Sequence, residues 1–129
     1  MSGRVDRLPF QYAVLRAVPR VDRGEYVNVG VILYCQDAAF LAAEVVVDAD
    51  RLRALWPSVD VEAVRMAAEA VVAACTDPVG AARENAGLAV RFGVLTAPRS
   101  TVVQPSPVHA GITADSQQTL TDLVTRLVR

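Results

Sequence analysis

Side chains that could carry chemistry are few and lie in different segments of the chain. Glu25 and Asn28 interrupt the run 24–34, which is otherwise rich in Val, Ile and Tyr. A carboxylate and an amide in such a run must find partners or reach a surface. Arg99 and Ser100 lie in a connecting segment, where a guanidinium fork and a hydroxyl can hold a phosphate or carboxylate. The predicted binding residues are Glu25, Asn28, Arg99, Ser100 and His109.

His109 is the only histidine, so a His-based metal site or a Ser-His-Asp relay would depend on it alone. A histidine in a loop is more often a hydrogen-bonded structural residue than a ligand or general base. Cys35 and Cys75 lie in different predicted elements without metal-ligand spacing, and both are predicted to be buried, reduced thiols. The residues therefore predict no catalytic group, no metal and no cofactor.

Structural alternatives to these binding roles stay open. Arg99 can belong to a turn and bind Glu25 or the chain's own carbonyls. A carboxylate at the end of an apolar strand needs a donor fork, and we expect Arg99 or Arg91 to supply it for Glu25. Gly30 inside a strand pattern indicates a bulge or the close approach of another backbone or a ligand. We expect Asn28 to be buried or half-buried and hydrogen-bonded to backbone near a bulge or a neighbouring loop.

Composition predicts one globular domain over residues 1–129, with residues 1–8 as a flexible lead-in. The net charge is -1, the 13 basic residues are all Arg, and no basic block or interleaved aromatic run suits a nucleic acid. The longest apolar runs fall far short of the ~18 residues of a membrane span, and no apolar leader opens the chain. We therefore expect a soluble, cytoplasmic protein that binds neither membranes nor nucleic acid.

Alternation of side chains predicts three consecutive strands over 10–18, 25–34 and 40–47. In the second of these, the face with Val27, Val29 and Val31 is predicted to be the core face. Two more strands are predicted after the central helices. Their ranges are 89–96 and 101–104, and residues 105–113 are predicted to be a loop because they hold two prolines and a glycine.

Helical spacing predicts a short helix over 51–55, capped by Asp48 or Asp50, and a longer one over 58–75 with Ser58 as its N-cap. A helical turn is predicted over 81–85. The final helix begins at Thr113 or Asp115, and its apolar stripe consists of Leu120, Leu123, Val124 and Leu127. The order is β-β-β-α-α-β-β-α, which predicts an α+β fold with helices packed on an antiparallel sheet of four to five strands.

Three patterns carry a resemblance to a known family. They are the G-E-x-x-N-x-G pattern within 23–31, the pair Arg91-Phe92 followed by the A-P-R-S sequence at 97–100, and the segment 106–111. With these patterns the chain, over roughly residues 10–128, resembles the bacterial "domain of unknown function 3037" family. It departs from the family at Val94, where an aromatic residue is expected. The family has no established activity, but its members are often encoded beside a HipA-like protein kinase.

Two functions of different classes follow from these observations. The first is a non-catalytic interaction protein, which the resemblance places beside a HipA-like kinase as an accessory or neutralising subunit in a toxin-antitoxin-like context. The second is a small anion- or nucleotide-binding module, or an enzyme, that uses Glu25, Asn28 and Arg99. Elimination favours the first, with a partner surface that includes segment 99–111, and a homodimer is the other partner left open.

Overall fold

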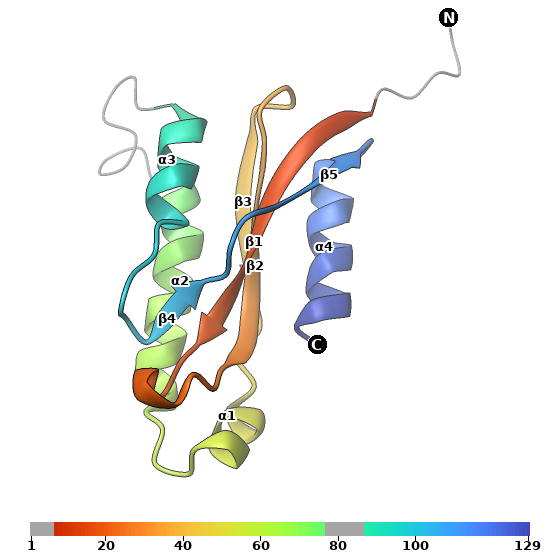
Figure 1. The fold of residues 1–129 in the computed structure, drawn as a ribbon. Helices are drawn as coiled ribbons and strands as arrows, with labels where there is room; N and C mark the ends of the chain where they lie inside the picture. Colours follow the sequence, from red (N-terminus) through yellow and green to blue (C-terminus); the bar gives the residue numbers. More distant parts are fainter. Residues whose placement is uncertain (1–6, 77–86) are drawn as a thin grey trace, which may run out of the picture.

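A single antiparallel sheet forms the centre of the molecule. The computed structural model describes residues 7–76 and 87–129, in which β3, β2 and β1 are neighbours and both β4 and β5 pair with β1. The predicted α+β class, with helices packed on an antiparallel sheet, is therefore confirmed (Figure 1). The five strands are β1 (Leu8–Ala17), β2 (Val27–Cys35), β3 (Phe40–Val45), β4 (Val103–Pro105) and β5 (His109–Thr113).

Helices cover both faces of this sheet. In Figure 1, α2 and α3 lie on one side of the strands and α4 lies on the other. A 3-10 turn, η1 (Val21–Arg23), connects β1 to β2. The helices in the described residues are α1 (Ala49–Leu55), α2 (Val61–Thr76), α3 (Leu88–Leu95) and α4 (Ser116–Leu127).

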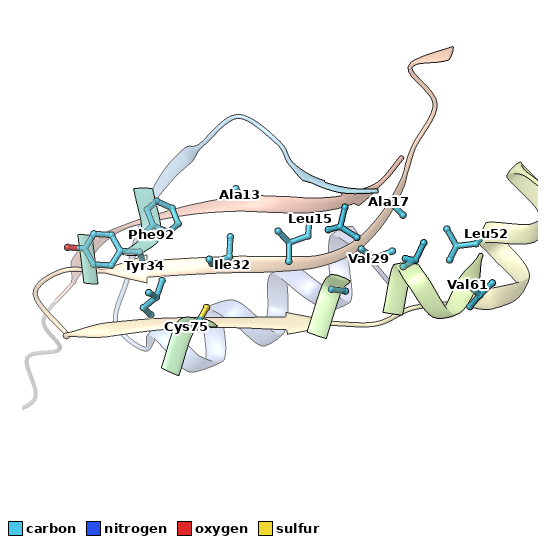
Figure 2. Packing of buried hydrophobic residues seen from close by; sticks show 14 residues of the cluster. Ala13, Leu15, Ala17, Val29, Ile32, Tyr34, Leu52, Val61, Cys75 and Phe92 are labelled. Carbon is cyan, nitrogen blue, oxygen red and sulfur yellow. The ribbon is translucent and has the colours of Figure 1, made fainter. Parts of the chain in front are cut away.

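The two helical layers create two hydrophobic clusters. Figure 2 shows the larger cluster, in which Leu15 and Ile32 of the sheet meet α1, α2 and α3, and Phe92 stacks on Tyr34 with ring centroids 5.4 Å apart. The smaller cluster lies under α4. Its buried members are Phe10, Val31, Leu33, Cys35, Leu120, Leu123, Val124 and Val128.

β2 is buried on both faces, so the prediction of a single core face was wrong. Val29 and Ile32 belong to the α2 side, whereas Val31 and Leu33 belong to the α4 side. Strict alternation would place Val29 and Val31 on the same face. An irregularity between them must therefore change the face to which the strand directs its side chains.

That irregularity is a β-bulge. Leu15 pairs with Gly30 and Arg16 pairs with Asn28, which leaves Val29 as an extra residue in β2. Gly30 is also required by close packing, because a Cβ atom there would lie 2.7 Å from the carbonyl oxygen of Glu44. The bulge thus directs Val29 to the α2 side, whereas Val31 and Leu33 face α4.

The first turns of α1, α2 and α4 are each capped by an aspartate side chain. The Asp48 carboxylate accepts a hydrogen bond from Arg51 N at 3.1 Å, and that of Asp115 accepts one from Gln118 N at 3.0 Å. Asp60, rather than the predicted Ser58, caps α2 by accepting from Ala63 N at 3.0 Å. Ser58 instead accepts a hydrogen bond from the Trp56 indole.

The predicted strand over 89–96 is wrong, because this segment forms α3. Leu88, Arg91, Phe92 and Leu95 are its buried or half-buried residues, and their spacing of three and four is that of one helix face. The neighbouring residues are apolar as well, so alternation also fitted the sequence.

The predicted loop over 105–113 was also wrong in part, because it contains β5. Pro105 is tolerated in β4 since the strand is bonded to β1 on one side only, and Gly111 lies under the Phe10 ring, where a Cβ atom would approach within 2.6 Å. The predicted turn over 81–85 and residues 1–6 of the predicted lead-in lie outside the described residues.

Two glycine substitutions test the packing at the bulge. We expect Gly30→Ala to lower the free energy of unfolding by about 1–3 kcal/mol, because the new Cβ meets backbone that cannot move freely. Gly93→Ala is the matched control, since nothing lies within 4 Å of a Cβ at this exposed helix position. It should stabilise α3 by up to about 1 kcal/mol. Urea denaturation measures both, and equal effects would contradict the bulge.

Candidate functional site

Asn28 serves the packing of the C-terminal helix. Its side chain is half-buried, and Nδ2 donates a hydrogen bond to the carbonyl oxygen of Leu127 at 2.9 Å, at the end of α4. That carbonyl is one of those that an α-helix leaves without an internal partner. The predicted backbone hydrogen bond beside a bulge is therefore confirmed.

Glu25 pairs with a neighbour in sequence rather than with a distant arginine. Its two carboxylate oxygens accept from Nε and Nη2 of Arg23 at 2.7 and 3.1 Å, so the predicted pairing with Arg99 or Arg91 was wrong. Gly24, at φ 70°, turns the chain between the two partners. Hydrogen bonding to Arg23 holds the pKa of Glu25 below its ordinary value.

Arg99 closes the end of α3. Its Nη2 donates to the carbonyl oxygen of Val94 at 2.5 Å and its Nε to that of Ala97 at 3.5 Å. A cation at a helix C-terminus suits both the free carbonyls and the helix dipole. The structure therefore places Arg99 in the turn that was the alternative to an anion site, and Ser100 is exposed beside it.

The predicted residues do not converge. Arg99 lines a hollow of about 320 Å³ with Ala67 and Val71 of α2, on one side of the sheet. His109 is exposed on β5, and its ring centroid lies 5.2 Å from that of Tyr12, which packs against the cluster under α4. Asn28 faces α4 as well. The sheet therefore separates Arg99 from Asn28 and His109.

A buried arginine that the sequence did not single out as a site connects α3 to α2. Arg91 donates from Nη1 to the carbonyl oxygen of Cys75 at 2.6 Å. Burial raises the pKa of the Cys75 thiol to about 11 although the Arg91 charge opposes the shift. Both cysteines are buried and free, as predicted, and at neutral pH Cys75 is a protonated thiol rather than a nucleophile.

The segment that follows Arg99 forms the exposed edge of the sheet beside β1. We call residues 103–113 the edge ribbon: β4 and β5 both pair with β1, and residues 106–108 interrupt them. Ser106 is buried at this interruption. Its backbone N–H donates to Val14 O at 2.8 Å, and its Oγ accepts from Val14 N at 2.8 Å. The hydroxyl thus replaces the backbone carbonyl that a regular ladder would offer.

Within residues 7–76 and 87–129, no group of three or more His, Cys, Asp and Glu side chains is placed to hold a metal ion. In the same part of the chain, none of the helices has both the length and the apolar character needed to cross a membrane.

The fold and its edge define a small α+β protein built on a five-stranded sheet. The chain belongs to the family described as "Protein of unknown function (DUF3037)", whose family model matches residues 12–128. No curated protein and no solved structure matches the chain. The resemblance seen in the sequence is therefore confirmed.

Ser106→Ala tests the attachment of the edge ribbon. We expect the free energy of unfolding to fall by about 1–3 kcal/mol, because the buried N–H of Val14 loses its acceptor. Amide exchange at Val14 should accelerate as well. Ser100→Ala removes an exposed hydroxyl and should stay within about 0.5 kcal/mol of wild type. A Val14 amide that keeps its protection in Ser106→Ala would contradict this role of the hydroxyl.

The pKa of Cys75 predicts a loss of stability in alkaline solution. The unfolded thiol ionises near its ordinary pKa of 9.0 and the folded one near 11. The stability gained by keeping the thiol neutral is therefore complete below pH 9 and lost as the pH rises to about 11. Urea denaturation of wild type and Cys75→Ala across this range should give a difference that shrinks with pH, and a constant difference would contradict the assignment.

Proposed function

We propose that this protein is a non-catalytic interaction protein and that segment 99–111 belongs to its partner-binding surface. One observation carries this proposal. Polar residues of the family-typical patterns, among them Asn28, Arg91 and Ser106, are engaged in building the fold, while side chains of the edge ribbon such as Val108 and Ile112 are exposed.

The roles of the family-typical residues are specific. Asn28 holds α4, Gly30 permits the bulge and Arg91 ties α3 to α2. Arg99 closes α3, and Ser106 attaches the edge ribbon to β1. A chain whose polar motif residues hold its scaffold together, and whose sheet has an exposed edge, suits recognition better than turnover.

Segment 99–111 combines a fixed backbone with exposed side chains. Pro105 and Pro107 restrict the backbone dihedrals, and buried Ser106 lies between them. Val108 and His109 are exposed directly afterwards. A surface ordered before binding loses little conformational entropy when a partner docks.

For the partner we propose a HipA-like protein kinase, to which this chain would be an accessory or neutralising subunit. The support for this partner is the resemblance to a family whose members are often encoded beside such a kinase. A cytoplasmic location suits this role, and two buried free thiols fit a reducing compartment.

The alternative of an anion- or nucleotide-binding module has weaker support. It needs Glu25, Asn28 and Arg99 together, and these residues have separate surroundings. Arg16, opposite Asn28, has a buried Nε without a partner among the described residues, but its guanidinium lies 4.2 Å from the centroid of the Tyr26 ring. This cation–π contact already uses the charge within the protein.

A binding measurement with the neighbouring kinase tests the proposal. We expect the Arg99→Ala/His109→Ala double variant to bind the kinase about tenfold more weakly than wild type, because both residues belong to segment 99–111, Arg99 on the α2 side of the sheet and His109 on the α4 side. Arg126→Ala is the matched control, since it removes an exposed arginine of α4 that lies outside segment 99–111. Its affinity should equal that of wild type.

Two further measurements make that result interpretable. Thermal denaturation of the double variant shows whether loss of the Arg99 contacts unfolds α3, and a screen for hydrolase and transferase activity runs in parallel. Unchanged kinase affinity, together with an activity that the double variant abolishes, would contradict the interaction proposal.

A further inference from the structure

The outer side of β5 is an open backbone edge. Among the described residues, β5 pairs with β1 and with no other strand. Pro9 lies opposite Ile112 and has no N–H, so this pair cannot exchange two hydrogen bonds. The bonded pairs must therefore be its neighbours, among them Phe10 with Gly111.

Backbone hydrogen bonds elsewhere on β1 show the same alternation of residues that bond to the edge ribbon. Val14 bonds to Ser106, and Val18 N donates to the carbonyl oxygen of Val102 at 2.8 Å, so the even-numbered residues of β1 face the edge ribbon. It follows that Ala110 and Ile112 direct their N–H and C=O groups away from β1, toward open space.

Most side chains along this edge are exposed, and none of them is Asp, Glu, Lys or Arg. Ile112 is 68% exposed, Val108 is 41% exposed, and residues 108–113 contain no charged side chain. Soluble proteins usually protect an open edge strand with charges, prolines or a bulge, because it can otherwise pair with another strand. The ribbon has its prolines at positions 105 and 107, and residues 108–113 lack such protection.

The opposite edge of the sheet, β3, is less suited to pairing. It carries the charge of Glu44, and α2 packs against it. Leu41 of β3 is buried in the cluster on the α2 side. Of the two edges, β5 is therefore the one that exposes apolar side chains beside free backbone groups.

We propose that the outer edge of β5 pairs antiparallel with β5 of a second copy of this chain. A twofold axis at Ala110 would place Ile112 of each copy opposite Val108 of the other. The edge is thus complementary to itself, which is what an isologous dimer requires. Backbone hydrogen bonds at Ala110 and Ile112 would join the two sheets into one.

A second copy fits this edge for two reasons. The exposed apolar side chains lie two residues on either side of the proposed axis, and the absence of charge in residues 108–113 leaves nothing to repel an identical strand. The strand is short, so the buried area is smaller than in a standard interface and the dimer should be weak, on the order of micromolar. This self-association goes beyond the proposed kinase binding.

Analytical ultracentrifugation of the full chain from about 1 to about 200 µM tests the dimer. We expect a monomer–dimer equilibrium that Ile112→Lys weakens at least about tenfold, because two lysines would have to be buried at the joined edge. Val94→Lys is the matched control, since Val94 is 58% exposed but lies on α3. It should leave the dissociation constant unchanged.

A cysteine substitution tests the register. Ala110→Cys should form a disulfide between two copies under mild oxidation, because directly opposed residues of a bonded pair lie about 5.5 Å apart. Ala38→Cys, in the exposed turn after β2, should not. A monomer at every concentration, or a dimer that Val94→Lys weakens and Ile112→Lys does not, would overturn the proposal. The kinase affinity of Ile112→Lys is measured separately, so that loss of the dimer and loss of kinase binding can be distinguished.

Discussion

β1 and β2 are covered on both faces, so their backbone N–H and C=O groups must find hydrogen-bond partners within the protein. The rest of the structure depends on supplying those partners. A buried N–H or C=O without a partner costs about 1–3 kcal/mol, whereas an ordinary hydrogen bond contributes about 0.5–1.5 kcal/mol. At two places where regular strand pairing is interrupted, another group supplies the missing hydrogen bond. Val46 N donates to the carbonyl oxygen of Val29 at the bulge, and the Ser106 hydroxyl accepts from Val14 at the break between β4 and β5.

This constraint explains why polar residues that serve the fold can be predicted as binding residues from the sequence. Asn28 resembles a ligand-binding amide in the sequence, yet its partner is the last turn of α4. Arg99 resembles an anion-binding residue, and its partners are carbonyl oxygens of α3 and of the residues just after it. Both groups satisfy helix ends, which is a frequent task of side chains that can donate hydrogen bonds.

Most of the helices and strands could be predicted because their signals are local. Alternation identified β1, β2 and β3, and helical spacing identified α2 and α4. α3 could not be told from a strand, because nearly every residue of Leu88–Leu95 is apolar and both periods fit. β5 was missed since its Pro and Gly neighbours are typical of loops, and only the position of Phe10 explains Gly111.

The candidate site was harder to predict because its residues are related only through tertiary contacts. Whether Glu25 meets Arg23 or Arg99 depends on a turn at Gly24 that the sequence does not specify. The openness of the β5 edge depends in the same way on the pairing of Pro9 with Ile112. Neither relation follows from composition or spacing.

Central to this account is an edge ribbon that is bonded firmly to β1 on its inner side and open on its outer side. Residue-resolved amide exchange by NMR, at a concentration where the chain is monomeric, tests this most directly. The account predicts slow exchange at His109 and Gly111, fast exchange at Ala110 and Ile112, and protection of the second pair when the concentration is raised. Slow exchange of Ala110 and Ile112 in the dilute monomer would contradict it.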